Sequence, residues 1–133
     1  MAIILDADVI ISGEKGVFDL SGWAASLPNE TFEIAAITIA ELWHGVERAS
    51  RPHKAKRQQY LEAIVAGLPI IPYTEQTAYE HARIWAELEA RGKMIGFYDV
   101  IVAATALERG SSLATFNQRH FSQVKGLSLI LPK

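Results

Sequence analysis

The chain has 133 residues, half of them hydrophobic, and this size and composition predict one globular domain over residues 1–133. A net charge of −2 excludes a protein that is basic overall, and the absence of cysteine excludes disulfides, thiol nucleophiles and cysteine-bound zinc. No apolar run approaches the roughly 20 residues of a membrane helix, so we expect no membrane contact and a cytoplasmic location.

The first predicted strand, Ile3–Leu5, lies in an unbroken apolar run of the kind that is buried on both faces of a parallel sheet. It leads directly into Asp6, for which two interpretations stay open. Asp6 either caps the helix that follows, or it is the first carboxylate of an acidic site at the carboxyl edge of the sheet. Further short strands are predicted at residues 32–37, 68–71, 112–115 and 127–130, the last of them at a sheet edge.

Helices are predicted between these strands. Thr38 and Glu41 have the spacing of a capping box, which predicts a helix from Thr38 to about residue 49, and Ser50 starts the next helix. Thr74 starts a long helix, and the stop signals of this helix and the following one are an arginine and then a glycine. The predicted buried stripe of the long helix is Ala78, Ala82, Trp85 and Leu88, and the stop signals are Arg91-Gly92 and Arg109-Gly110.

Short strands that alternate with helices predict an α/β protein with three α/β/α layers around a mostly parallel sheet of about five strands. Four polar residues then occupy equivalent places, because Asp6 and Asn117 follow strands while Glu41 and Asp99 lie in first turns of helices. Helix capping explains each of them alone. Together they predict an acidic site at one sheet edge, where a divalent cation such as Mg²⁺ or Mn²⁺ would offset the repulsion and support phosphodiester hydrolysis.

Four motifs, in this order, resemble the PIN-domain ribonucleases, specifically the VapC-type toxins of toxin–antitoxin pairs. They are Ile4-Leu5-Asp6-Ala7-Asp8-Val9-Ile10, Thr38-Ile39-Ala40-Glu41-Leu42-Trp43-His44-Gly45-Val46-Glu47, Ile95-Gly96-Phe97-Tyr98-Asp99-Val100-Ile101-Val102-Ala103-Ala104 and Leu113-Ala114-Thr115-Phe116-Asn117-Gln118-Arg119-His120-Phe121. Each motif alone has low specificity, but the ordered set is fairly specific and spans essentially the whole chain.

The resemblance implies that Asp6, Glu41 and Asp99 are catalytic and hold Mg²⁺ or Mn²⁺, which activates water for hydrolysis of RNA to 5′-phosphate and 3′-hydroxyl ends. The fourth acidic position of the family falls on Asn117, whose neutral amide holds a second cation less well and puts a two-metal mechanism in doubt. The resemblance also implies an RNA substrate such as transfer RNA, a homodimer, and a small antitoxin protein that blocks the site.

Three further residues are predicted to support this site. Asp8 stands where the family more often has a neutral polar residue, and it either supplies the missing charge or hydrogen-bonds the loop, which we favour. Thr115 either orients site groups by hydrogen bonding or is an ordinary strand threonine. Arg119 is the candidate contact for an RNA phosphate.

Other polar and aromatic residues have simpler interpretations. The basic stretch Arg48–Arg57 predicts a solvated helix face, with an RNA contact surface as the alternative. His44 is interpreted as structural and His120 as an ordinary surface residue, and both Trp43 and Trp85 are expected in the core.

Two functions from other classes stay open beside the ribonuclease. Asp6-Ala7-Asp8-Val9 superficially matches the nucleophile motif of aspartyl phosphatases, although the later acidic pair of that class is missing. The neutral Asn117 leaves room for a PIN-like module that binds RNA and cleaves it weakly or not at all.

Overall fold

A computed structural model describes residues 2–133, and in this range the protein has five strands and seven helices. The strands are β1 (Ala2–Leu5), β2 (Thr31–Ala35), β3 (Ile70–Ile71), β4 (Ser112–Ala114) and β5 (Leu129–Ile130). The helices are α1 (Ala7–Glu14), α2 (Leu20–Ala25), α3 (Ala36–Arg48), α4 (Arg51–Ala66), α5 (Glu75–Arg91), α6 (Phe97–Arg109) and α7 (Gln118–Phe121).

The sheet has the strand order β3-β2-β1-β4-β5, and all of its neighbouring strands are parallel. The chain starts in the central strand β1, builds one half of the sheet outward through β2 and β3, and later builds the other half through β4 and β5. Strand β1 is therefore the topological switch point, and open α/β sheets leave a crevice at the carboxyl ends of such strands. Leu5 is in register with Ala114, which brings Asp6 beside Thr115 at this edge.

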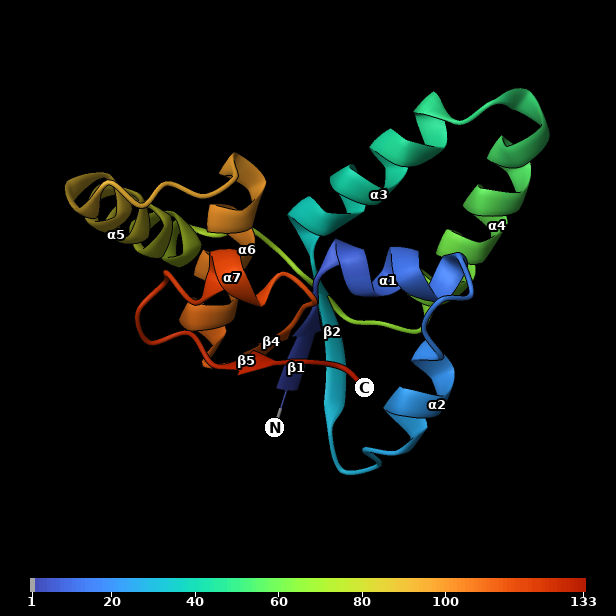
Figure 1. The fold of residues 1–133 in the computed structure, drawn as a ribbon, viewed down its shortest axis with the longest axis horizontal. Coiled ribbons are helices and arrows are strands. Elements are labelled where there is room, and N and C mark those ends of the chain that lie inside the picture. The colour runs from blue at the N-terminus through green and yellow to red at the C-terminus, as the bar shows by residue number, and fades with distance from the viewer. Residues whose placement is uncertain (1) are drawn as a thin grey trace.

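Helices cover both faces of the sheet, as the alternation of elements predicted (Figure 1). The side chains of successive β1 residues point to opposite faces of the sheet. Ile3 and Leu5 pack into a core with α1 to α4, while Ile4 packs into a second core with α5, α6 and α7. All three side chains are almost completely buried. The predicted three-layer α/β/α arrangement with an edge strand at β5 is confirmed.

Two predicted helix ends are confirmed by backbone conformation. Helices α5 and α6 are followed by Gly92 and Gly110, whose φ angles of 65° and 68° are left-handed. Side chains with a Cβ adopt this region at a cost, so glycine after an arginine is a reliable stop signal.

The predicted capping box at Thr38 is wrong. Helix α3 begins at Ala36, and its N-cap Ala35 has no side-chain cap. Thr38 is fully buried inside the helix, and its hydroxyl has no hydrogen-bond partner among residues 2–133. The boundary between β2 and α3 falls inside the apolar run of residues 34–37, where no change in polarity marks it in the sequence. Glu41 consequently lies in the second helical turn.

The predicted buried stripe of α5 is confirmed at Leu88 and wrong at Ala82 and Trp85. The buried residues are Thr77, Ile84 and Leu88, whereas Ala82 is exposed and Trp85 is 45% exposed. Trp43, in contrast, is partly buried against the first core, as expected. The face of α5 that is buried is no more apolar than the face predicted to be buried. The packing of α5 on α6 determines which of the two faces is covered. None of the helices described in residues 2–133 has the length and apolarity needed to cross a membrane.

Candidate active site

Asp6 is the first residue beyond β1, and its carboxyl group has both of the roles that the sequence left open. One oxygen, Oδ1, accepts a hydrogen bond from the amide of Ala7 at 2.9 Å and so caps α1. The other, Oδ2, accepts from the Thr115 hydroxyl at 2.8 Å and faces the crevice beside β4. Burial, together with the negative charge of Asp8, raises the pKa of Asp6 to about 7.

Asp8 and Thr115 form a hydrogen-bonded link between the β1 and β4 sides of the site. The Asp8 carboxylate accepts from the Phe116 amide at 3.1 Å and lies 3.3 Å from the Thr115 hydroxyl oxygen. A hydroxyl donates only one proton, and the shorter contact of Thr115 is the one to Asp6. The Thr115 hydroxyl oxygen in turn accepts a hydrogen bond from the backbone amide of Asn117 at 2.9 Å. This geometry gives Asp8 and Thr115 positions from which they support Asp6.

Glu41 approaches the same edge from the second turn of α3. Its Oε1 atom is buried and has no hydrogen-bond partner among the described residues. Burial, followed by the charges of Asp99 and Asp8, raises the pKa of Glu41 to about 7. An unpaired buried carboxylate oxygen is costly, which points to a cationic ligand that is not part of the protein chain.

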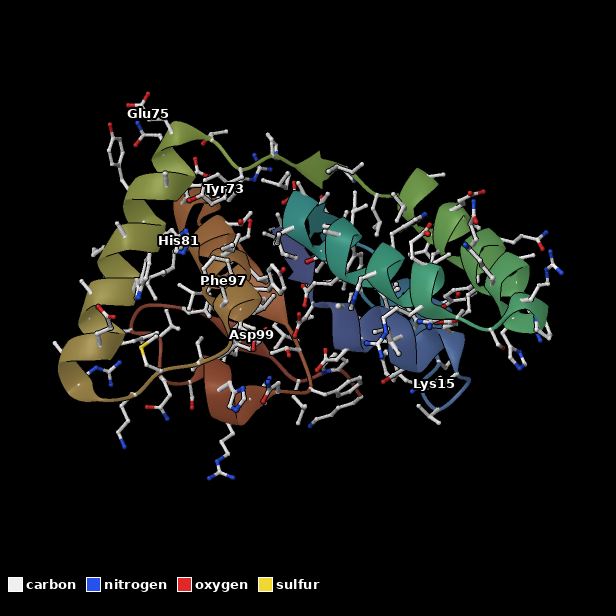
Figure 2. All side chains as sticks on the ribbon, turned by 90° about the horizontal axis from the view of Figure 1, so that it is seen from above. Lys15, Tyr73, Glu75, His81, Phe97 and Asp99 are labelled. Carbon is white, nitrogen blue, oxygen red and sulfur yellow. The ribbon has the colours of Figure 1, made fainter. Side chains whose placement is uncertain are left out.

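Asp99 is the third residue of α6 and lies in its first turn, and Figure 2 labels it on the side of α6 that faces the centre of the molecule. Gly96 leaves room for this carboxylate, because a Cβ atom there would stand 3.3 Å from Asp99 Oδ2. Burial raises the pKa of Asp99, and the neighbouring His120 opposes that rise. The Asp99 charge also raises the pKa values of Asp6 and Glu41, which indicates that Asp99 lies near both of them.

His120 is exposed, as expected, but it is not a remote surface residue. Its Nδ1 atom lies 3.7 Å from Asp99 Oδ2, which is an ionic contact when the imidazole is protonated. The same nitrogen is 3.0 Å from the Asn117 side-chain nitrogen atom. Asn117 therefore holds His120 and not the central carboxylates. Asn117 is the N-cap of α7 and His120 lies three residues later in that helix, and this spacing was the sequence signal for the pair.

The acids fit a divalent cation by the chemistry of their donor atoms. Oxygen ligands and a concentration of negative charge are what Mg²⁺ and Mn²⁺ select. Within residues 2–133, no three acidic or histidine side chains already stand together as a complete ligand set. A bound cation would offset both the cost of burying these carboxylates and the repulsion between them, the two causes of the raised pKa values of Asp6 and Glu41.

The basic residues are divided between α7 and the region where α3 meets α4. Arg119 is exposed on α7, next to His120. In the stretch Arg48–Arg57, Arg57 is held by Glu14 at 2.9 Å and Lys54 by Glu47 at 3.6 Å, so part of the stretch serves to connect α1, α3 and α4. The exposed residues Arg48, Arg51 and Lys56 agree with the predicted solvated face.

Comparison with known proteins decides the family. The PIN domain matches residues 3–127. The chain belongs to the PIN-domain family. Ribonuclease VapC1 of Rickettsia felis is 31% identical to this PIN domain over 131 residues, which are 98% of this chain and 96% of that protein. The tRNA(fMet)-specific endonuclease VapC of Salmonella typhimurium is 31% identical over 96 residues, 72% of this chain and 71% of that protein.

Solved structures agree with this assignment. VapBC2 of Rickettsia felis, bound to a DNA fragment from its promoter, matches this PIN domain with a TM-score of 0.91 and 26% identity, covering 98% of each chain. FitAcB of Neisseria gonorrhoeae matches with a TM-score of 0.79 and 27% identity, over 98% of this chain and 97% of that one. These findings confirm the resemblance to VapC-type ribonucleases of toxin–antitoxin pairs, and they favour it over the aspartyl phosphatase alternative.

Proposed function

We propose that this PIN-domain protein is an endoribonuclease that depends on Mg²⁺ or Mn²⁺ and acts in the cytoplasm as the toxin of a toxin–antitoxin pair. The observation that carries the proposal is the set of three carboxyl groups, Asp6, Glu41 and Asp99, at the switch point of the sheet. Burial raises the pKa of each, and the charge of Asp99 adds to the rise at Asp6 and Glu41. The ribonuclease names of its relatives give the reaction class.

In this proposal Asp6, Glu41 and Asp99 hold the ion. The bound ion supplies an activated water and stabilises negative charge on a phosphoryl group. Thr115 fixes the Asp6 carboxylate by donating to Oδ2, and Asp8 anchors the following loop through the Phe116 amide. The Asn117 amide is neutral and contacts His120, so it adds no fourth negative charge to the site, and we propose that one ion suffices.

The partners are proposed from the relatives. The VapBC structures that this chain resembles are toxin–antitoxin complexes. We propose that an antitoxin binds this chain in the same manner. One relative is named for its action on an initiator transfer RNA, which makes transfer RNA the proposed substrate class here.

Cleavage of total cellular RNA by the purified protein tests the function. With Mg²⁺ or Mn²⁺ we expect discrete fragments that carry 5′-phosphate ends, and with EDTA we expect none. RNA binding without fragments and without metal dependence would instead support the catalytically inactive module.

Arg119 provides a second test, at the level of substrate binding. Arg119→Ala is expected to raise KM by roughly 3- to 10-fold and to leave kcat nearly unchanged, because it removes one phosphate contact outside the acidic centre. The slope of log K for RNA binding against log salt concentration should become shallower by about one unit. Lys56→Ala is the matched control, since Lys56 is exposed on α4 within the basic stretch. An equal effect of both variants would contradict a specific role for Arg119.

A homodimer is also proposed, through an aromatic patch of α5 and α6. His81 stacks on Trp85 at 5.8 Å and meets Phe97 edge-on, and its Nδ1 atom lies 2.8 Å from the Tyr73 hydroxyl. Figure 2 shows Tyr73, His81 and Phe97 together on this side of the molecule. Trp85 and Phe97 are 45% and 62% exposed, which is unusual for rings of this size unless a partner covers them.

Trp85→Glu is therefore expected to convert the dimer to a monomer, because burying an unpaired carboxylate in that interface is costly. Size-exclusion chromatography with light scattering would measure the mass at several concentrations. Ala86→Glu adds the same charge to the exposed neighbouring position of α5 and should leave the dimer intact. A monomeric wild-type protein at all concentrations would rule out this interface.

A further inference from the structure

A pocket of about 520 Å³ opens beside the acidic centre, between α1, α3 and α6. Its size lies in the range of small-molecule sites. One of its walls is Glu41, so it is continuous with the candidate active site. The pocket is lined by Ala7, Ile11, Ala40, Glu41, His44 and Tyr98.

The lining combines a small apolar floor with two flat rings. Ala7, Ile11 and Ala40 contribute only methyl and aliphatic groups. Tyr98 is 51% exposed and precedes the candidate ligand Asp99 in the chain. Among the ring contacts of residues 2–133, Tyr98 pairs with Phe97 alone, edge-on at 5.6 Å, so it is free to stack on a further ring. The contributions of His44 and Tyr98 were not foreseen from the sequence.

We propose that this pocket binds the nucleobase next to the scissile phosphate, with Tyr98 as its stacking surface and His44 as a second wall. The proposal rests on the proposed ribonuclease function and adds a specificity subsite to it. Aromatic side chains bind bases of any sequence through their π-faces, and each stacked base contributes a substantial part of the affinity for single strands.

Charge favours a base over other parts of the substrate. The Glu41 carboxylate repels a phosphate, whereas a neutral base does not suffer this repulsion and its exocyclic amino group can donate to a carboxylate. A base in this pocket leaves its own phosphate at the adjoining acids, where a cation would offset the charge. The geometry also requires the base to be unpaired, because bases in an RNA duplex are already stacked on one another.

Binding of nucleotides, measured by NMR on the isotope-labelled full chain with Mg²⁺, tests the pocket without cleavage. The probes are the four ribonucleoside 5′-monophosphates, with ribose 5-phosphate as the control that lacks a base. We expect at least one nucleotide to shift the signals of Ala7, Ile11, Ala40 and Tyr98, and to bind at least roughly 5-fold more tightly than ribose 5-phosphate.

Two variants alter the pocket and leave the acids in place. Tyr98→Ala removes the stacking ring, while Tyr98→Phe retains it. Ala40→Leu fills the pocket at an exposed helical position, where leucine is nearly as good a helix former as alanine, and Ala86→Leu is its control on α5. We expect Tyr98→Ala and Ala40→Leu to lower kcat/KM by roughly 5- to 100-fold on single-stranded RNA, and Tyr98→Phe and Ala86→Leu to stay near wild type.

The outcomes separate this proposal from the proposed function. Efficient RNA cleavage by Tyr98→Ala and Ala40→Leu, or equal binding of nucleotides and ribose 5-phosphate, would overturn the base subsite while the ribonuclease stands. Nucleotide binding in the pocket of a protein that cleaves no RNA would support the subsite and overturn the enzyme. Signal shifts with N-acetyltryptophanamide but not with nucleotides would assign the pocket to a protein partner and overturn the subsite.

Discussion

Asp6→Asn is expected to lower RNA cleavage by roughly 100- to 1000-fold and, at the same time, to stabilise the metal-free protein above pH 7. The loss of activity follows from removing one negative charge that would face the cation, at a cost similar to that of other single electrostatic contacts in active sites. Asparagine has nearly the same shape, and its amide can still pair with the Thr115 hydroxyl and the Ala7 amide. The fold should therefore persist.

The gain in stability has a separate cause. Asp6 is only 5% exposed, and burial raises its pKa from 3.8 to about 7, so ionising it costs the folded state roughly 4 kcal/mol at most, at 1.36 kcal/mol per pKa unit. Asparagine avoids that cost. Urea unfolding at pH 5 and pH 8, beside a cleavage time course, would measure both effects on one preparation.

Asp19→Asn is the matched control for this substitution. Asp19 caps α2 by accepting from the Gly22 amide at 3.0 Å, and asparagine is an equally good N-cap. Cleavage and stability should both stay near wild type. Unchanged cleavage by Asp6→Asn itself would mean that the activity comes from a contaminant or from a different site.

The second expectation is that the metal-free protein loses several kcal/mol of stability as the pH rises from about 4 to 8. The folded pKa values of Asp6 and Glu41 are about 7, above their ordinary values of 3.8 and 4.5. Between these limits the folded state binds more protons than the unfolded state, so the free energy of unfolding falls with rising pH. Asp8 and Asp99, whose pKa values are also raised, act in the same direction.

Mg²⁺ should reverse this loss and release protons when it binds. An ion that binds only the folded state adds about 2.7 kcal/mol at a concentration 100 times its Kd. The gain should be large at pH 8 and small at pH 5, where protons compete for the same carboxylates. Urea unfolding at each pH, with EDTA or MgCl₂, measures it. Stability that is flat across this range in EDTA would contradict the proposed cluster of buried acids.

The sequence predicts the positions of strands and glycine stops better than helix faces. β1 and β4 are found within one residue of their predicted bounds, since apolar runs are encoded by adjacent residues. The start of α3 and the buried face of α5 depend on packing against other elements. Thr38 and Trp85 were therefore assigned to the wrong environments, and neither error was visible in the local pattern.

The candidate site shows the same division. Asp6, Glu41 and Asp99 were predicted at one edge because strand ends and helix starts of a parallel sheet converge there. The contact of His120 with Asp99 and the pocket formed by His44 and Tyr98 join side chains from different helices. No spacing rule relates such pairs, so only the assembled structure reveals them.

The central place of β1 determines when the site can exist during synthesis. Thr115 donates to Asp6 across 109 residues of chain, and the β1–β4 pairing brings Ile3 beside Ser112. A nascent chain that has emerged only through α5 contains Asp6 and Glu41 but lacks Asp99, Thr115 and half of the sheet. Pairings of such long sequence separation also form slowly. A ribosome that makes this protein is therefore exposed to an active nuclease only after the last third of the chain has left it and folded.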